Sequence, residues 1–390
     1  MKLLVIDPHV THKSPSMRAW VEALPVVRGL FDEIEIWASE CDVAVGDGVI
    51  WRRIEQRLPT WTLHALDYQR RVRQMLRMLP PDSTRLVQVT GCMVAEADIR
   101  YIHYWNSALL EERAARPRNF PLPLRAQVTA QLAARQEAAA VKHARRTDQW
   151  WVVSRALAQR ISASGAAGQF DILPNQYDPG RFNHAVRNEW REPLRSHYGF
   201  QPGELVLVFS AFGHFERKGL RQAVEAVECL RHCGHQVRLL ILGGSPATVR
   251  RFRHTLSPTQ RDGCVFAGLV DHIERHLAAA DGLLFPSHFE AFSLAEIEAA
   301  ALGLRLYLTA HYGSEMILRE PSNGRLLPWD PAGMAAVIAQ DIAAGRLGQT
   351  HHEMGEALTM DSYQTRLRTL YQDTISAKRS SSGDAVHPFH

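Results

Sequence analysis

The sequence lacks any run of apolar residues long enough to cross a membrane. No stretch reaches the roughly 18 apolar residues that a spanning helix needs. The apolar start, residues 3–6, is also too short for a secretory signal. With 390 residues, 46% of them hydrophobic, the chain can form two or three domains with sizeable cores. We therefore expect a soluble protein that stays in the cytoplasm.

Cysteine and lysine are both scarce. The five cysteines are an odd number scattered over apparent core segments, which favours reduced thiols over a disulfide framework. Cys229 and Cys233 stand four residues apart on an expected helix without a second ligand pair, so core packing is favoured over zinc binding. The formal net charge is +4, and arginine supplies nearly all of the positive charge. A charge this small, without an aromatic and basic module, argues against nucleic-acid binding.

Short apolar strands alternate with helical stretches along the whole chain. They are expected at residues 3–6, 33–37, 86–89, 100–103, 149–153, 205–210, 237–242, 263–267 and 282–285. Such alternation predicts an α/β protein with parallel sheets covered by helices. Because there are too many strands for one open sheet, the polar stretch at residues 175–182, with Pro179 and Gly180, is interpreted as a hinge between two Rossmann-like halves.

The most informative segment spans residues 285–298. An apolar strand ends at Pro286 and Ser287, Glu290 follows, and a helix is expected from the N-cap Ser293. The free N–H groups around Leu294 and Ala295 would form an anion site for a diphosphate. Glu298 follows Glu290 by eight residues, and two glutamates at this spacing also occur by chance on solvated helices. The conjunction with a basic turn about 70 residues upstream, at residues 217–219, favours a sugar-nucleotide site over that alternative.

These motifs resemble the glutamate-x7-glutamate motif of the family 4 retaining glycosyltransferases (glycosyl transferases group 1), which have the GT-B fold. Further matching segments are residues 206–209, 213, 217–220, 239–244, 265–268, 313–315 and 323–324, in a form most similar to bacterial lipopolysaccharide core glucosyltransferases. The resemblance covers residues 150–335 and is looser before them. It implies two Rossmann-like domains whose parallel sheets face each other across a cleft.

The resemblance also implies how the domains are divided. We expect an acceptor-binding domain at residues 1–178 and a nucleotide-sugar-binding domain at 179–360. A C-terminal helix at 361–377 would pack back on the first domain, as in GT-B enzymes. Residues 378–390, rich in serine, cannot bury enough apolar surface to become ordered, so we expect a disordered tail.

Donor-binding roles follow from the resemblance residue by residue. Arg217 and Lys218 would bind the diphosphate, Glu298 the ribose hydroxyls, and Glu290 the hydroxyls of the transferred sugar. The remaining donor contacts implied by the motifs are Gly213, Gly268, Phe292, Ser293 and Leu294. Glu296 is expected to be a surface residue. The chain has no Asp-x-Asp pair after a strand, so we expect neither a divalent metal nor another cofactor.

In the first half, His103 ends an expected strand where family 4 enzymes present an active-site histidine. It is the first catalytic candidate there, with a structural histidine as the alternative. Asp98 resembles an aspartate of the core glucosyltransferases and is the second, with a turn-capping aspartate as the alternative. The loop after the first strand lacks the glycine pair usual in the family. Either Ser14, Ser16 and Arg18 therefore contact the donor in place of the glycines, or the loop serves the acceptor through His12, Lys13, Ser16 and Arg18.

The predicted function is transfer of a hexose from a nucleoside diphosphate sugar to a glycan or glycolipid precursor, such as lipopolysaccharide, with retention. The alternatives are a GT-B hydrolase or epimerase acting on the sugar nucleotide, and a catalytically idle GT-B subunit that binds a glycan. Basic clusters of the first half fit two interpretations equally well: a binding surface, for anionic lipid at the inner face of the membrane or for a phosphorylated acceptor, and an ordinary solvated helix face. They are Arg70, Arg71, Arg73, Arg77, Arg113, Arg116, Arg118, Arg125, Arg135, Lys142, Arg145 and Arg146.

Overall fold

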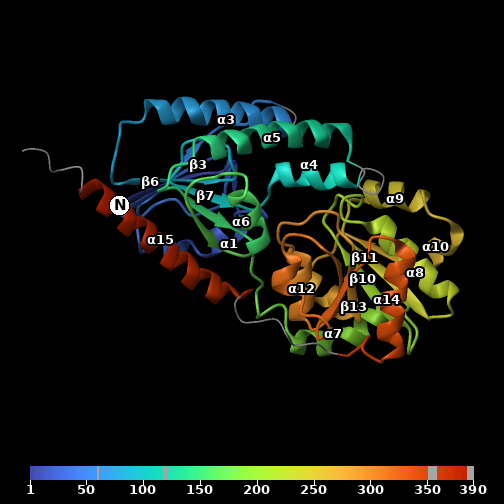
Figure 1. Cartoon of the computed structure of the whole chain (residues 1–390). Coiled ribbons are helices and arrows are strands. Elements are labelled where there is room, and N and C mark those ends of the chain that lie inside the picture. Colours follow the sequence, from blue (N-terminus) through green and yellow to red (C-terminus); the bar gives the residue numbers. More distant parts are fainter. Residues whose placement is uncertain (59–60, 117–121, 350–357, 384–390) are drawn as a thin grey trace, which may run out of the picture. The chain divides into compact units, whose positions relative to one another are not determined.

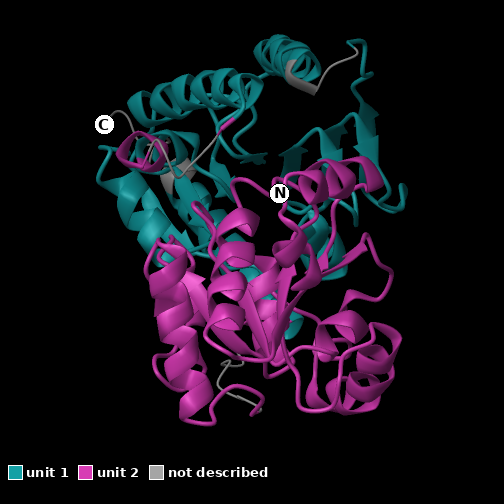
Figure 2. Ribbon diagram, turned by 90° about the vertical axis from the view of Figure 1, so that its right-hand side faces the viewer, with its two compact units in different colours: residues 1–111, 123–175, 360–390 teal, residues 112–122, 176–359 magenta. Residues whose placement is uncertain are grey.

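The computed structural model describes residues 1–58, 61–116, 122–349 and 358–383 (Figure 1). The chain divides into two compact units (Figure 2). Unit 1 comprises Met1–Glu111, Pro123–Asn175 and Met360–His390, and unit 2 comprises Glu112–Leu122 and Gln176–Thr359. The main crossing at Asn175 lies in the hinge segment expected from the sequence, three residues before the expected boundary. Among the described residues, no helix is both long enough and apolar enough to traverse a bilayer.

Unit 1 contains a seven-stranded sheet in the order β5-β3-β1-β6-β7-β8-β9, and each of its recorded strand pairs is parallel. Central strands are buried on both faces, as β1 and β7 show, and all their residues except Lys2 and the buried Arg100 are apolar or aromatic. The strands are β1 (Lys2–Ile6), β3 (Glu33–Ala38), β5 (Val49–Arg53), β6 (Arg85–Thr90), β7 (Ile99–Ile102), β8 (Gln149–Val152) and β9 (Gln169–Ile172), with a small separate pair, β2 (His9–Val10) and β4 (Glu40–Cys41).

Helices cover this sheet, and the last helix of the chain returns to it. They are α1 (Arg18–Glu22), α2 (Leu24–Arg28), α3 (Trp61–Met78), α4 (Asn106–Ala115, which starts in unit 1), α5 (Leu124–Lys142), α6 (Arg155–Ser162) and α15 (Met360–Gly383). Tyr371 of α15 is fully buried, and its hydroxyl group accepts a hydrogen bond from Trp20 Nε1 at 2.8 Å and donates one to Gln88. This buried polar contact fixes α15 to the sheet of unit 1.

The end of α15 differs from the sequence expectation. The helix continues to Gly383, whereas the sequence predicted an ordered end at residue 377 and a disordered tail from 378. Lys378 explains part of the difference, because its ammonium group forms an ion pair of 2.9 Å with Asp98. The remainder of the expected tail, residues 384–390, lies outside the described residues.

Unit 2 contains a six-stranded sheet in the order β12-β11-β10-β13-β14-β15, again with parallel pairs. Its strands are β10 (Leu205–Ser210), β11 (Val237–Leu242), β12 (Cys264–Gly268), β13 (Gly282–Phe285), β14 (Arg305–Thr309) and β15 (Gly324–Leu327). Its helices are α7 (His184–His197), α8 (Leu220–His232), α9 (Pro246–His254), α10 (Pro258–Asp262), α11 (Ile273–Ala278), α12 (Leu294–Ala301), α13 (Ser314–Ile317) and α14 (Pro331–Ala343).

Strand order identifies one position in each sheet where a ligand is expected. In open parallel sheets, ligands bind at the carboxyl ends of the strands, where the direction of strand succession reverses. In unit 2 that reversal falls between β10 and β13. In unit 1 it falls between β1 and β6. The loops that follow these four strands are therefore the first places to look for a functional site.

Candidate functional site

The loop between β10 and α8 carries the two cations expected from the sequence. It packs so tightly on the end of β13 that a Cβ atom on Gly219 would stand 2.0 Å from the carbonyl oxygen of Pro286. Gly219 also has a φ of +77°, a conformation that side-chain-bearing residues avoid. The backbone N–H of His288 donates to the carbonyl oxygen of Arg217 at 2.9 Å. The glycine therefore lets Arg217 and Lys218 lie beside the loop that follows β13.

Glu290 is the centre of this site. One of its carboxylate oxygens, Oε1, lies 2.6 Å from Lys218 Nζ and 3.0 Å from Arg217 Nη1, and it accepts a hydrogen bond of 2.8 Å from Ser287. Burial alone would raise the pKa of Glu290. The positive charges of Lys218 and Arg217 outweigh burial and lower this pKa to about 2, so the carboxylate is ionised at neutral pH.

The amino-terminal end of α12 follows directly. Ser293 occupies the N-cap position that the sequence predicted, but its side chain makes no capping hydrogen bond. Helix α12 starts at Leu294, and the first N–H groups of a helix have no partner within it. Glu298 lies four residues further, about 6 Å along the axis at 1.5 Å per residue, and is half-buried. Phe292 is buried beneath this turn, where a Cβ on Gly313 would come within 2.8 Å of its Cα.

Glu296 is not the surface residue that the sequence predicted. Its side chain is completely buried, and a carboxylate oxygen lies 2.9 Å from Nε2 of the equally buried His311. Burial would lower the pKa of His311, but the charge of Glu296 outweighs burial and raises it above its ordinary value. His311 in turn contributes to the lowered pKa of Glu290, so this second pair is electrostatically part of the site.

The glycines predicted to contact the donor lie at the same edge of the sheet. Gly268 ends β12 with a φ of +70°, and its carbonyl oxygen accepts a hydrogen bond of 2.6 Å from Gly243. Gly213 follows β10, with no atom within 4 Å of the place where a Cβ would stand. Beside them Phe212 and Leu269 are 86% and 52% exposed. Sequence reasoning missed these two apolar side chains, because exposure cannot be inferred from residue type.

In unit 1, His103 lies where the sequence placed it, directly after β7 and at the carboxyl end of the strand. Burial lowers the pKa of His103 to about 3, although a hydrogen bond with Asn175 opposes this shift. The imidazole is therefore neutral at pH 7. Its Nε2 atom is buried and has no hydrogen-bond partner within the described part of the chain. A neutral histidine with one unsatisfied nitrogen can bind a hydroxyl group or a phosphate oxygen.

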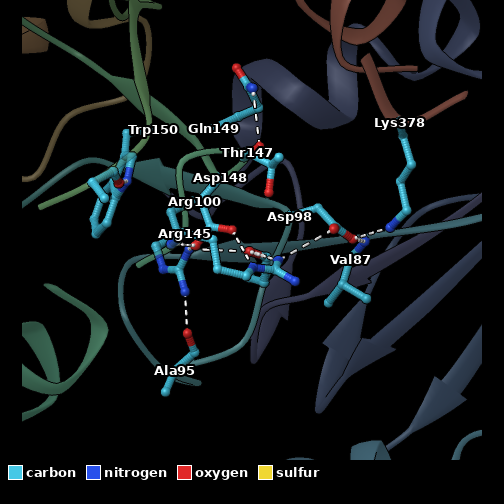
Figure 3. A network of polar contacts seen from close by, with 12 residues as sticks. Val87, Ala95, Asp98, Arg100, Arg145, Thr147, Asp148, Gln149, Trp150 and Lys378 are labelled. Atoms are coloured by element: carbon cyan, nitrogen blue, oxygen red, sulfur yellow. Dashed lines mark hydrogen bonds and ion pairs between the residues drawn. The ribbon is translucent and has the colours of Figure 1, made fainter. Parts of the chain in front are cut away.

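Asp98, the second catalytic candidate, lies at the other edge of this sheet. It precedes β7, and its carboxylate accepts a hydrogen bond of 2.8 Å from the backbone of Val87. It also forms ion pairs with Lys378 at 2.9 Å and Arg145 at 3.5 Å (Figure 3). Catalytic groups of parallel sheets gather at the carboxyl ends of the strands. The structure therefore gives Asp98 a structural position, in which it binds α15, and does not bring it to the edge that holds His103.

The expected acceptor loop runs between β2 and α1. His12 contacts Asp42, with its Nδ1 atom 3.1 Å from the carboxylate, and Ser16 shares a hydrogen bond of 3.1 Å with Ser14. Lys13 is exposed, and Arg18 begins α1. The structure thus places His12, Lys13 and Ser16 in one loop after β1, with Arg18 at its end.

Sequence reasoning missed Asp7, at the carboxyl end of β1. Its carboxyl group is 4% exposed and accepts a hydrogen bond of 2.7 Å from the backbone of His9. Burial raises the pKa of Asp7 to about 6, although hydrogen bonds from His9 and Thr90 oppose the shift. Thr90 ends β6, so Asp7 lies at the point where strand succession reverses in unit 1. Its place directly after a strand was the available signal.

Comparison with known proteins supports the interpretation of unit 2. Residues 203–343 match the family described as glycosyl transferases group 1. The chain is 29% identical over 223 residues to a glycogen synthase of Mycobacterium tuberculosis, across 54% of this chain and 49% of the relative. It thus spans about half the length of the curated relatives it matches.

Solved structures match nearly the whole chain at low identity. WaaG, a glycosyltransferase involved in lipopolysaccharide biosynthesis, has a TM-score of 0.66 at 17% identity, covering 99% of this chain and 100% of WaaG. HepE from Anabaena, in complex with UDP and glucose, has a TM-score of 0.56 at 15% identity, covering 99% of both chains. At this identity the likeness establishes the fold alone. It confirms the predicted fold class, an α/β protein of the GT-B type with two parallel sheets.

Proposed function

We propose that this protein, whose residues 203–343 match the glycosyl transferases group 1 family, transfers a hexose from a nucleoside diphosphate sugar to a glycan or glycolipid acceptor. The observation that carries this proposal is the convergence of Arg217, Lys218 and Glu290 in front of α12, where strand succession reverses. Two half-buried cations, a buried carboxylate and the first helix N–H groups supply contacts for both a diphosphate and a sugar.

Unit 2 is the proposed donor-binding unit. Arg217, Lys218 and the N–H groups of Leu294 and Ala295 bind the diphosphate, and Glu298 accepts hydrogen bonds from the ribose. Glu290 holds hydroxyl groups of the sugar. Exposed Phe212 and Leu269, beside Gly213 and Gly268, offer apolar surface to the base. The complex of HepE with UDP and glucose supports a nucleotide donor for a protein of this fold.

The chemical step exchanges one bond of the anomeric carbon for another. The bond to the phosphate oxygen breaks, a bond to the acceptor hydroxyl oxygen forms, and the hydroxyl proton passes to the departing phosphate. Negative charge grows on that phosphate, and Arg217 and Lys218 stabilise it electrostatically. Because these cations are part of the protein, we propose a transfer that needs no divalent ion. Retention of the anomeric configuration is proposed from the resemblance of the motifs to the retaining family. Undiminished turnover in the presence of a chelator supports the first point, and the anomeric configuration of the product tests the second.

Unit 1 is the proposed acceptor-binding unit. Asp7 and His103 directly follow β1 and β7, strands whose carboxyl ends share one edge of its sheet. The loop with His12, Lys13, Ser16 and Arg18 comes after the short strand β2, which begins three residues beyond β1. The acceptor we propose is a precursor of a cell-surface polysaccharide or lipopolysaccharide, in line with the role of WaaG. Contact of the basic helices with the inner face of an anionic membrane belongs to the same proposal.

A panel of UDP-, GDP- and ADP-sugars tests the function and identifies the donor. A ligand present at 100 times its dissociation constant stabilises a protein by about 2.7 kcal/mol, which a thermal-shift assay detects. The stabilising donor is then incubated with and without glycan acceptors. Release of nucleoside diphosphate that depends on an acceptor supports a transferase. Equal release without any acceptor would instead indicate a hydrolase, and stabilisation by none of the donors would contradict the proposal.

A further inference from the structure

A pocket of about 240 Å³ lies at the amino-terminal edge of the sheet of unit 1, far along the strands from Asp7 and His103. Its walls include Asp98, Arg145, Arg146 and the part of α15 that carries Lys378. Liquid water occupies about 30 Å³ per molecule, so the pocket has space for an ion of several heavy atoms. Neither the family match, which begins at residue 203, nor the proposed transfer involves this pocket.

Contacts with neighbouring carboxylates and a carbonyl oxygen hold the guanidinium group of Arg145 in place (Figure 3). The carboxylate of Asp148, which is 1% exposed, accepts from Nε of Arg145 at 2.7 Å and from the buried Arg100 at 2.8 Å. The Nη2 atom of Arg145 contacts the carbonyl oxygen of Ala97 and the carboxylate of Asp98. The guanidinium plane is thus fixed before any ligand arrives, which lowers the entropy lost on binding.

The charges around the pocket do not balance. Arg100 neutralises Asp148, and Lys378 neutralises Asp98. The charges of Arg145 and Arg146 remain, which is an excess of two positive charges. Arg146 is exposed and forms no ion pair with any residue that the structure describes. One further carboxylate, that of Glu96, acts on Arg145, but Glu96 is exposed and water screens its charge.

We propose that this pocket binds a dianionic phosphate group between Arg145 and Arg146, beside the carboxyl-terminal half of α15. Guanidinium groups pair with two phosphate oxygens at once, and a dianion balances the excess of two charges. Because Lys378 lies in the same wall, a bound phosphate strengthens the attachment of α15 to the sheet. The group belongs either to a free phosphate ester or to a lipid head group, and the two sources share this chemistry.

Inorganic phosphate is the probe for the test. The melting temperature of the full chain is measured against phosphate concentration at constant ionic strength, with chloride as the balancing anion. Arg146→Gln removes one binding guanidinium from an exposed position, so the variant is expected to fold. Arg251→Gln on α9 of unit 2 is the matched control, because Arg251 is exposed as well. Lys218→Ala weakens phosphate binding at the proposed donor site and separates the two sites.

We expect phosphate to stabilise the parent protein and the Arg251→Gln variant alike, and to go on stabilising the Lys218→Ala variant through this pocket. In Arg146→Gln the apparent dissociation constant should rise about tenfold or more, since a charge-assisted hydrogen bond is lost. Equal stabilisation of Arg146→Gln and the parent, or a response lost only in Lys218→Ala, would overturn the proposal. No response to phosphate overturns it too, unless vesicles with phosphatidic acid bind the parent and not Arg146→Gln. That result supports the lipid source, whereas a response to phosphate without vesicle binding supports a free ester.

Discussion

Replacing Glu290 by glutamine tests the electrostatics of the donor site. The substitution keeps the size of the side chain and removes its charge. The pKa of Glu290 falls from an ordinary 4.5 to about 2, a shift of about 2.5 units, which at 1.36 kcal/mol per unit corresponds to about 3 kcal/mol. The carboxylate is 7% exposed, so solvent screens this energy little. Ionised Glu290 should therefore stabilise unit 2 by about that amount at neutral pH.

The pH dependence gives the direction of the effect. Because the folded pKa lies below the unfolded one, the stabilisation is complete above pH 4.5 and is lost as the pH falls toward 2. Urea denaturation of parent and Glu290→Gln should thus differ by about 3 kcal/mol at pH 7, and by roughly half of that at pH 3. A difference that is the same at both values would show that packing is responsible, and would refute the electrostatic reasoning.

Ligand binding by the same variant separates the two roles of the site. Without Glu290, Lys218 and Arg217 lose their carboxylate partner and remain available to a diphosphate. We expect the affinity for the nucleoside diphosphate to be kept or to increase, while the affinity for the nucleotide sugar falls relative to it. Isothermal titration calorimetry measures both constants. An equal loss of the two affinities would contradict a role of Glu290 in holding the sugar.

Three further substitutions have clear expected outcomes. In Glu296→Gln, His311 loses the partner that raises its pKa, and the variant should lose about 3 to 5 kcal/mol of unfolding free energy at pH 6. This loss should shrink as the pH rises through the raised pKa of folded His311, and a loss that stays constant with pH would contradict the ion pair. Asp7→Asn removes a buried carboxyl group whose pKa is about 6, so the stability of the variant relative to the parent should be about 3 kcal/mol greater at pH 7 than at pH 4. The same variant should turn over more slowly, and an unchanged turnover would exclude Asp7 from the acceptor site. Asp341→Asn should cost about 3 to 5 kcal/mol in urea denaturation, because the fully buried Asp341 is the partner of the equally buried Arg305; a loss below 1 kcal/mol would argue against that pair.

The strands that the sequence predicted are rich in apolar residues, with single polar residues such as Gln88, Arg100 and Arg238 among them. Each of the predicted strands is present within one residue of its expected ends. Strand β14, which escaped prediction, begins with Arg305, a charged residue that is fully buried in the structure. Arg305 pairs with the buried Asp341 and donates to the carbonyl oxygens of Pro321 and Ser322. Strand β5, with its exposed residues, is an edge strand of unit 1 and lacks an apolar run. Such elements depend on contacts with distant parts of the chain.

Dependence on distant contacts also decides which site residues could be predicted. Arg217, Lys218 and Glu290 were predicted together from the resemblance of their motifs. They converge in the structure because the loops that carry them follow neighbouring parallel strands. The burial of Glu296 could not be predicted, because its partner His311 follows another strand, β14. Asp98 precedes β7, so the order of residues already puts it at the amino-terminal end of that strand. It became a catalytic candidate through the resemblance to core glucosyltransferases, and not through its place beside the strand.

The central claim is that unit 2 binds a nucleoside diphosphate through Lys218 and Glu298. Isothermal titration of UDP, GDP and ADP into the parent protein, Lys218→Ala and Glu298→Ala tests it directly. Loss of one charged hydrogen-bond partner costs roughly 1.5 to 3 kcal/mol, so we predict that at least one nucleotide binds the parent and that each variant binds it one to two decades more weakly. Identical affinities in all three proteins would contradict the account.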